Sequence, residues 1–124
     1  MTVPPPTSQP RMIARISTHV LDTEAGRPAV GIPVGLQAVS DDRTAHYVGG
    51  GVTDDDGRVG SLCDGAVPAG TYRLIFDTVD YFVGVHHKMF YPRITVDVYL
   101  DGARDHYHVP VLASLYSFTT YLGS

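Results

Sequence analysis

Residues 93–100 read RITVDVYL, an alternation in which every second side chain is apolar. Successive side chains of a β-strand point to opposite faces of the sheet, so this pattern predicts a strand with one buried row and one solvent-facing row. The Asp101-Gly102 pair that follows is a turn signal and marks the end of the strand. The expected buried row is Ile94, Val96, Val98 and Leu100.

Similar strand-like stretches, separated by turns that contain Gly, Pro or Asp, extend over the chain beyond Met12. Eight short strands at this spacing are typical of a β-sandwich, so we expect an all-β fold. One segment departs from the pattern, because Asp77 or Thr78 is a helix N-cap candidate and Gly84 is a stop signal, which predicts one short helix. The predicted strands are residues 13–21, 32–38, 45–52, 58–62, 71–76, 93–100, 106–113 and 116–122.

Length and composition restrict the class of protein. The chain has 124 residues, which suffices for one domain. Four prolines and little apolar surface precede Arg11, so we expect a flexible arm at residues 1–12 and a folded domain at residues 13–124. A formal net charge of −4, with cations scattered along the chain, argues against a nucleic-acid-binding protein.

The sequence contains no signal for a membrane or a secretory location. No apolar run approaches the roughly 18 residues that span a bilayer, and the first residues lack the apolar region of a signal peptide. The single cysteine, Cys63, excludes an intramolecular disulfide, and without a basic neighbour it is interpreted as a packed apolar side chain rather than a nucleophile. We therefore expect a cytoplasmic protein.

Six histidines supply the side chain that titrates nearest to neutral pH. Alternation puts the apolar rows of the first and seventh predicted strands in the core, which leaves His19, His106 and His108 on the outer face of a sheet. His106 and His108 point the same way and could chelate a metal, but no third ligand has a suitable spacing, so we favour no metal site. His86 and His87 follow the predicted helix and are expected to be exposed in a loop.

Two terminal segments resemble the transthyretin-related family, which includes the 5-hydroxyisourate hydrolases of urate degradation. The first is residues 17–23, Ser-Thr-His-Val-Leu-Asp-Thr, and the second begins with His-Tyr-His-Val-Pro at residues 106–110 and ends with Gly123-Ser124. Between them, Asp-Gly-Arg at residues 56–58 is similar in kind and order. The resemblance covers residues 13–124, almost everything except the arm.

The resemblance implies a transthyretin-like β-sandwich of about eight strands with one short helix, assembled as a homotetramer whose active faces line a channel. It implies hydrolysis of 5-hydroxyisourate to 2-oxo-4-hydroxy-4-carboxy-5-ureidoimidazoline, with this small molecule as the partner and with no cofactor. Carried over by position, the catalytic residues are His19, Arg58 and His108, and the substrate-binding residues are Tyr121 and Ser124. From spacing alone, Arg58 would be a surface cation beside a turn.

The implied reaction needs one group that activates water and another that stabilises negative charge. An imidazole with a pKa near its ordinary value of about 6.5 is a suitable general base. A guanidinium stays charged and can bridge two acceptors of a planar, urate-like ligand. The resemblance therefore suggests His19 or His108 as the base, the other as its water-positioning or acid partner, and Arg58 as the clamp. The sequence does not determine which of the two histidines is the base.

The chain departs from the family pattern at three positions, where Leu122 replaces an Arg, Leu115 replaces a Pro and Ala113 replaces a Leu. Leu122 removes a cation close to the expected pocket, although alternation predicts that it points away from Tyr121. The alternative to an enzyme is a non-catalytic transthyretin-like carrier that binds small aromatic ligands in the tetramer channel. A carrier has no need for the polar trio of two histidines and an arginine, which favours the enzyme.

Overall fold

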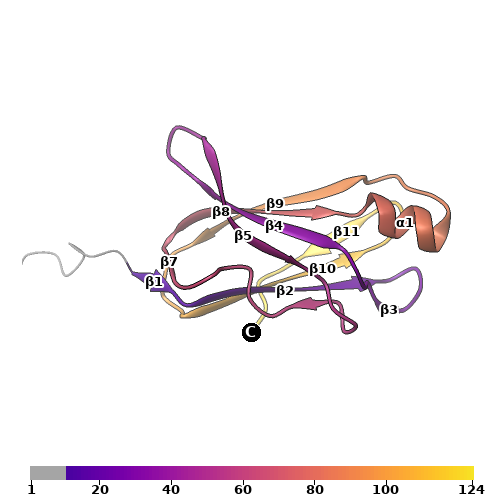
Figure 1. The fold of residues 1–124 in the computed structure, drawn as a ribbon, viewed down its shortest axis with the longest axis horizontal. Helices are drawn as coiled ribbons and strands as arrows, with labels where there is room; N and C mark the ends of the chain where they lie inside the picture. Colours follow the sequence, from indigo (N-terminus) through magenta and orange to yellow (C-terminus); the bar gives the residue numbers. More distant parts are fainter. Residues whose placement is uncertain (1–10) are drawn as a thin grey trace, which may run out of the picture.

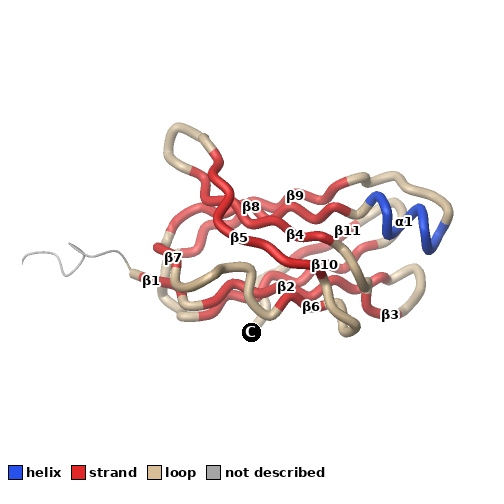
Figure 2. Tube along the Cα trace, viewed as in Figure 1, coloured by secondary structure: helices blue, strands red, loops and turns tan. Residues whose placement is uncertain are grey.

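The computed structural model describes residues 11–124, which form two facing β-sheets with one helix at one end (Figure 1). The first sheet is antiparallel in the order β5-β4-β8-β9, and the second has the order β11-β10-β2-β3, with β6 also paired to β2 (Figure 2). A small ribbon, β1-β7, lies beside them. The elements are β1 Met12–Ile13, β2 Arg15–Asp22, β3 Arg27–Pro28, β4 Pro33–Val39, β5 Ala45–Val52, β6 Arg58–Val59, β7 Val67–Pro68, β8 Gly70–Asp77, α1 Val79–His86, β9 Arg93–Leu100, β10 His106–Ala113 and β11 Phe118–Thr120.

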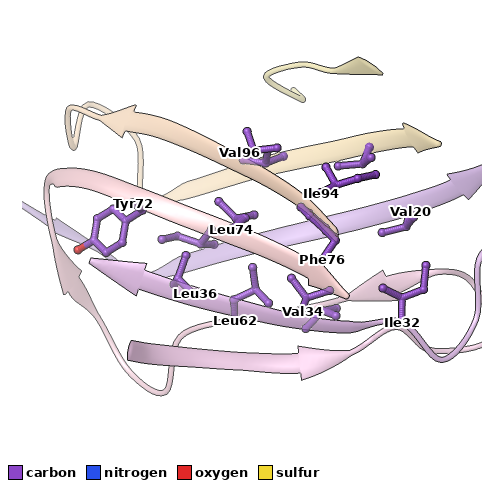
Figure 3. Packing of buried hydrophobic residues seen from close by; sticks show 14 of the residues in the cluster. Val20, Ile32, Val34, Leu36, Leu62, Tyr72, Leu74, Phe76, Ile94 and Val96 are labelled. Atoms are coloured by element: carbon purple, nitrogen blue, oxygen red, sulfur yellow. The ribbon is translucent and has the colours of Figure 1, made fainter. Parts of the chain in front are cut away.

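Buried apolar side chains from both sheets meet in one layer between them (Figure 3). The alternation predicted for β9 is confirmed, because Ile94, Val96 and Leu100 are buried and Val98 is half-buried against the same cluster. Cys63 packs into this core, and burial raises the pKa of its thiol, which agrees with a packed apolar role. The predicted all-β sandwich is confirmed, and each predicted strand region contains a strand.

Three of the predicted strands are divided or shortened. The first breaks at Ala14, because the N–H groups of Ala14 and Arg15 both donate to the carbonyl of Asp105 (2.8 and 3.0 Å) and so separate β1 from β2. The strand predicted at 58–62 is only β6, and the one predicted at 116–122 is only β11. Local hydrogen-bond partners, which strand propensity does not encode, decide where each ladder ends.

The arm predicted at residues 1–12 falls mostly outside the described residues, which begin at Arg11. Met12, its last residue, is described and pairs with Pro68 in the β1-β7 ribbon. The paired structure therefore begins one residue before the predicted domain boundary.

Helix α1 confirms the predicted short helix, but two expectations about its end are wrong. The helix begins after its N-cap, Thr78, and continues through Gly84 to His86. It ends at His87, which adopts the left-handed conformation (φ 59°, ψ 21°). A glycine inside a helix costs only about 1 kcal/mol relative to alanine, and burial of Phe82 against the core offsets this cost. His86 therefore lies in the last helical turn rather than in an exposed loop.

Candidate active site

Two parallel strands, β2 and β10, bring the histidine-bearing rows of the chain together. Their register pairs His106 with Arg15 and His108 with Ser17, and His19 lies two residues further along β2. Side chains at alternate positions of a strand share one face, so this row lies opposite the buried row of β2. All three histidines are half-buried there. The prediction that they share the outer face of one sheet is confirmed.

Arg58 reaches the same face from β6, where it pairs directly with His19. A tight turn leads into this strand, because the N–H of Gly57 donates to the carbonyl of Asp54 and the Asp54 carboxylate accepts from the N–H of Arg58 (2.9 Å each). Gly57 has φ +76°, and a Cβ there would collide with the carbonyl of Val20, so only glycine fits. Strand pairing thus makes Arg58 a neighbour of His19 and not merely a surface cation beside a turn.

A groove of about 330 Å³ lies on this face. None of the described residues that line it is acidic, and the lining contains two guanidinium groups and two imidazoles, which favours an anionic or carbonyl-rich ligand. Of the predicted site residues, the groove brings together Arg58, His108 and Ser124, while His19 lies next to Arg58 on the neighbouring strand. The lining residues are Arg15, Ser17, Thr18, Arg58, Val59, Gly60, His106, His108 and Ser124.

A chain of hydrogen bonds connects four of these side chains. Arg15 Nη2 lies 3.1 Å from His106 Nδ1, and Ser17 Oγ lies 2.6 Å from His106 Nε2. The same Ser17 Oγ lies 2.8 Å from His108 Nδ1. Reasoning from the sequence missed Ser17 as a functional residue, because only the parallel register of β2 and β10 places it between the two imidazoles.

Both imidazoles in this chain are shifted toward their neutral forms. Burial lowers the pKa of His106 below its ordinary value of 6.5, and the positive charge of Arg15 lowers it further. Burial also lowers the pKa of His108, with further contributions from the positive charge of Arg58 and from His106, His19 and Arg15. At neutral pH each ring therefore carries one proton and one free lone pair, as a hydrogen-bond chain requires.

The segment after β11 packs directly against His108. The N–H of Gly123 donates to the carbonyl of His108 (2.8 Å), and the carbonyl of Gly123 accepts from Arg104 Nη1 (3.0 Å). Gly123 is buried, and a Cβ at this position would lie 2.7 Å from His108 Cδ2. This close contact holds Ser124 in the lining of the groove.

We expect Gly123→Ala to displace the His108 ring or Ser124, because the added methyl has no free space. The variant should lose on the order of tenfold in kcat/KM for the substrate proposed below, since small misplacements at a site are costly. Gly84→Ala is the matched control, because a Cβ at Gly84 meets nothing within 4 Å. Initial rates and thermal melts of both variants test this, and a parental rate for Gly123→Ala would contradict the close packing.

Tyr121 is not brought into the groove within one chain. It lies with Leu122 in a neighbouring depression against β9, and their exposed fractions are 52% and 57%. β11 ends at Thr120, so both residues lie beyond the strand, where the alternation that predicts opposite directions for them no longer applies. A role for Tyr121 in substrate binding stays a prediction.

A second polar cluster, which sequence reasoning missed, joins helix α1 to the end of β2. Asp22 is buried, accepts hydrogen bonds from Tyr81 Oη (2.6 Å) and the N–H of Ala25 (2.9 Å), and lies 2.7 Å from His86 Nε2. Burial opposes ionisation of Asp22, but the hydrogen bonds from Tyr81, Ala25 and His86 outweigh it and hold the pKa below 3.8. A signal existed in the sequence, because Asp22 continues the buried row of β2, where a carboxylate requires partners.

Two further features of the described residues bear on function. Among residues 11–124, no three His, Cys, Asp or Glu side chains form a group that could hold a metal ion. His106 and His108 are instead joined through Ser17, with 6.3 Å between their ring centroids. The described part of the chain also has no helix with the length and apolar character needed to cross a membrane.

Comparison with proteins of known sequence gives one consistent family. The family model described as HIUase/Transthyretin family matches residues 16–123. The 5-hydroxyisourate hydrolase of Salmonella dublin is 39% identical over 110 residues, which is 88% of this chain and 80% of the relative. The 5-hydroxyisourate hydrolase 2 of Rhizobium meliloti (strain 1021) is 40% identical over 121 residues, which is 89% of this chain and 96% of the relative.

Solved structures agree with this result. The structure of Klebsiella pneumoniae 5-hydroxyisourate hydrolase has a TM-score of 0.78 at 29% identity, covering 90% of this chain and 100% of that one. Sea bream transthyretin in complex with thyroxine has a TM-score of 0.80 at 26% identity, covering 88% and 94%. The sandwich is therefore transthyretin-like, as expected. With its sequence and its fold both matched over most of their length, this chain belongs to the HIUase/transthyretin family.

Proposed function

We propose that this protein hydrolyses 5-hydroxyisourate to 2-oxo-4-hydroxy-4-carboxy-5-ureidoimidazoline in urate degradation. The observation that carries the proposal is the pairing of Arg58 with His19 across β6 and β2, beside a groove that contains His108. The Salmonella and Rhizobium relatives, which are named 5-hydroxyisourate hydrolases, support the same reaction.

The proposed chemistry is attack of water on a ring carbonyl. A C–O bond forms while one proton of the water passes to an imidazole, and the carbonyl oxygen gains negative charge. Arg58 keeps its own charge, binds the planar substrate through two acceptors and stabilises the developing oxyanion. The ring C–N bond then breaks, and the leaving nitrogen takes up a proton. His19 and His108 supply the imidazoles, and the scheme uses no cofactor.

We also propose that the groove is completed in a homotetramer, where the outer faces of the β2-β10 sheets line a channel. Exposed aromatic and aliphatic side chains near β9 and β11 support an interface, because Tyr99, Tyr116 and Leu122 are 73%, 63% and 57% exposed. In such an assembly Tyr121 would face substrate in the channel. Sedimentation equilibrium should give the mass of four chains, and a monomer would contradict this part of the proposal. The cytoplasm is the expected location of such an enzyme.

The test of the activity is the ultraviolet absorbance decay of freshly generated 5-hydroxyisourate with and without the purified protein. We expect clear acceleration at catalytic protein concentrations. The carrier alternative predicts tight binding of an aromatic ligand such as thyroxine, which sea bream transthyretin holds in its solved structure, and no acceleration. That second result, from a folded protein, would overturn the hydrolase proposal.

A further inference from the structure

We infer that Arg15, His106 and Ser17 form a positioning relay that fixes which nitrogen of His108 carries the proton, making His108 a hydrogen-bond donor and leaving His19 as the general base. The kinetic part of this inference rests on the proposed hydrolysis. Its structural part, the position of a proton on His108, is measurable without any substrate.

The relay has a direction because it begins at an arginine. A guanidinium has only donors, so Arg15 Nη2 donates to His106 Nδ1 across their 3.1 Å separation. Nδ1 of His106 must then carry no proton, and the neutral ring carries its proton on Nε2. Burial and Arg15 both lower the pKa of His106, which keeps this ring neutral. His106 Nε2 therefore donates to Ser17 Oγ at 2.6 Å.

Ser17 transmits this direction to His108. Its hydroxyl has one proton, is 5% exposed as a residue, and has His108 Nδ1 at 2.8 Å as its remaining side-chain partner. Donation from Ser17 Oγ to His108 Nδ1 gives every polar group of the relay a hydrogen-bond partner. The reverse arrangement would give the hydroxyl two donors and leave its own proton unpaired in a buried place, which is unfavourable because a buried donor without an acceptor loses its hydration without compensation. His108 therefore accepts at Nδ1 and carries its proton on Nε2.

The two catalytic histidines consequently differ in what they can do. No hydrogen bond within residues 11–124 occupies His108 Nε2, and no buried side-chain nitrogen or oxygen in this part of the chain lacks a partner, so Nε2 reaches solvent. An N–H at this atom can donate to a carbonyl oxygen but cannot accept a proton from water. His19 has no side-chain hydrogen bond among the described residues, so either of its nitrogens can present a lone pair.

This assignment gives a balanced reaction. His19 takes one proton from the attacking water as the C–O bond forms, and the substrate carbonyl becomes an oxyanion held by His108 Nε2–H and Arg58. The oxyanion collapses, the ring C–N bond breaks, and the His19 imidazolium returns its proton to the leaving nitrogen. His108 keeps its proton throughout, so Ser17, His106 and Arg15 orient it and transfer nothing.

The direct test is long-range ¹H–¹⁵N correlation NMR of the whole protein labelled at histidine, without substrate, at pH 8, which lies above the lowered pKa of His108. His108 should show an unprotonated Nδ1 and a protonated Nε2. Protonation of His108 on Nδ1 would overturn the inference whatever the activity proves to be. Conversely, the expected tautomer in a protein that does not accelerate hydrolysis would leave the relay intact and overturn only the proposed function.

Two substitutions at one position test the direction. In His106→Gln the amide oxygen can accept from Arg15 and the amide N–H can donate to Ser17, so His108 should keep its proton on Nε2. In His106→Glu the carboxylate accepts from both Arg15 and Ser17. The Ser17 proton then points toward the carboxylate and away from His108, so His108 must donate to Ser17 from Nδ1. A tautomer that is the same in both variants would contradict the relay.

Kinetics then separate positioning from simple structure. Ser17→Ala should lower kcat on the order of tenfold with little change in KM, because His108 is free to present either nitrogen to the oxyanion. Ser17→Thr keeps the hydroxyl and should restore both kcat and the His108 tautomer. Equal loss in the two variants, or a loss expressed only in KM, would mean that Ser17 acts through packing and would overturn its positioning role.

Discussion

Replacing His108 with alanine is expected to lower kcat for 5-hydroxyisourate by on the order of a hundredfold or more. The side chain lines the groove with Arg58, and its removal takes away a donor to the oxyanion, a contact that matters most in the transition state. The β10 backbone continues its ladder with β2 regardless of this side chain, so the fold should persist. Steady-state rates from the ultraviolet assay, with circular dichroism of the same samples, measure both effects.

Two further variants sharpen this result. His108→Gln keeps an N–H donor and should lose less than the alanine variant if His108 donates rather than accepts a proton. His46→Ala removes an exposed imidazole from β5, on the opposite sheet, and should leave the rate unchanged. A His108→Ala protein that is folded and assembled and retains near-parental turnover would show that the site is assigned to the wrong residues.

Replacing Asp22 with alanine is expected to lower the free energy of unfolding by about 3 kcal/mol. Its carboxylate is buried and holds Tyr81, Ala25 and His86, so truncation leaves three polar groups without their acceptor and loosens helix α1 from β2. Urea denaturation at neutral pH measures the loss. A change below about 1 kcal/mol, within the range of ordinary surface substitutions, would show that water replaces the carboxylate without cost.

The pH dependence of stability provides an independent check on Asp22. Its pKa in the folded protein lies below the ordinary 3.8, so its ionised form adds stability that is fully present above pH 3.8 and is lost as the pH falls through the folded value. Asp22→Asn keeps the shape but cannot ionise, so its unfolding free energy should fall less steeply in this acid range. Parallel curves for the two proteins would contradict the assigned pKa.

Much of the fold followed from alternation, whereas the ends of elements did not. The apolar rows of β2, β9 and β10 were predictable because a period of two fixes which side chains share a face. The end of α1 was not predictable, because Gly84 is a stop signal by propensity, whereas the helix continues through it and places His86 against Asp22 and Phe82. At such points, packing against residues that are distant in sequence outweighs the helix propensity of the local residues.

The candidate site shows the same division. Family resemblance supplied His19, Arg58 and His108, and alternation placed both histidines on the outer face. Neither could identify Ser17 as a functional residue, because its role depends on lying opposite His108 in the parallel pair of β2 and β10. The register between two strands that are distant in sequence cannot be predicted from either strand alone. Tyr121 was placed by resemblance only, and within a single chain it lines a neighbouring depression rather than the groove.

The pairing of β2 with β10 also determines when the groove can form during synthesis of the chain. Ser17 and His108 are 91 residues apart, so the two halves of the groove meet only after a long loop has closed. Contacts of such high sequence separation form slowly and cooperatively. A nascent chain that ends before β10 can therefore contain both His19 and Arg58, on β2 and β6, and still lack the groove. The groove of a single chain should therefore form in one step with completion of the sandwich.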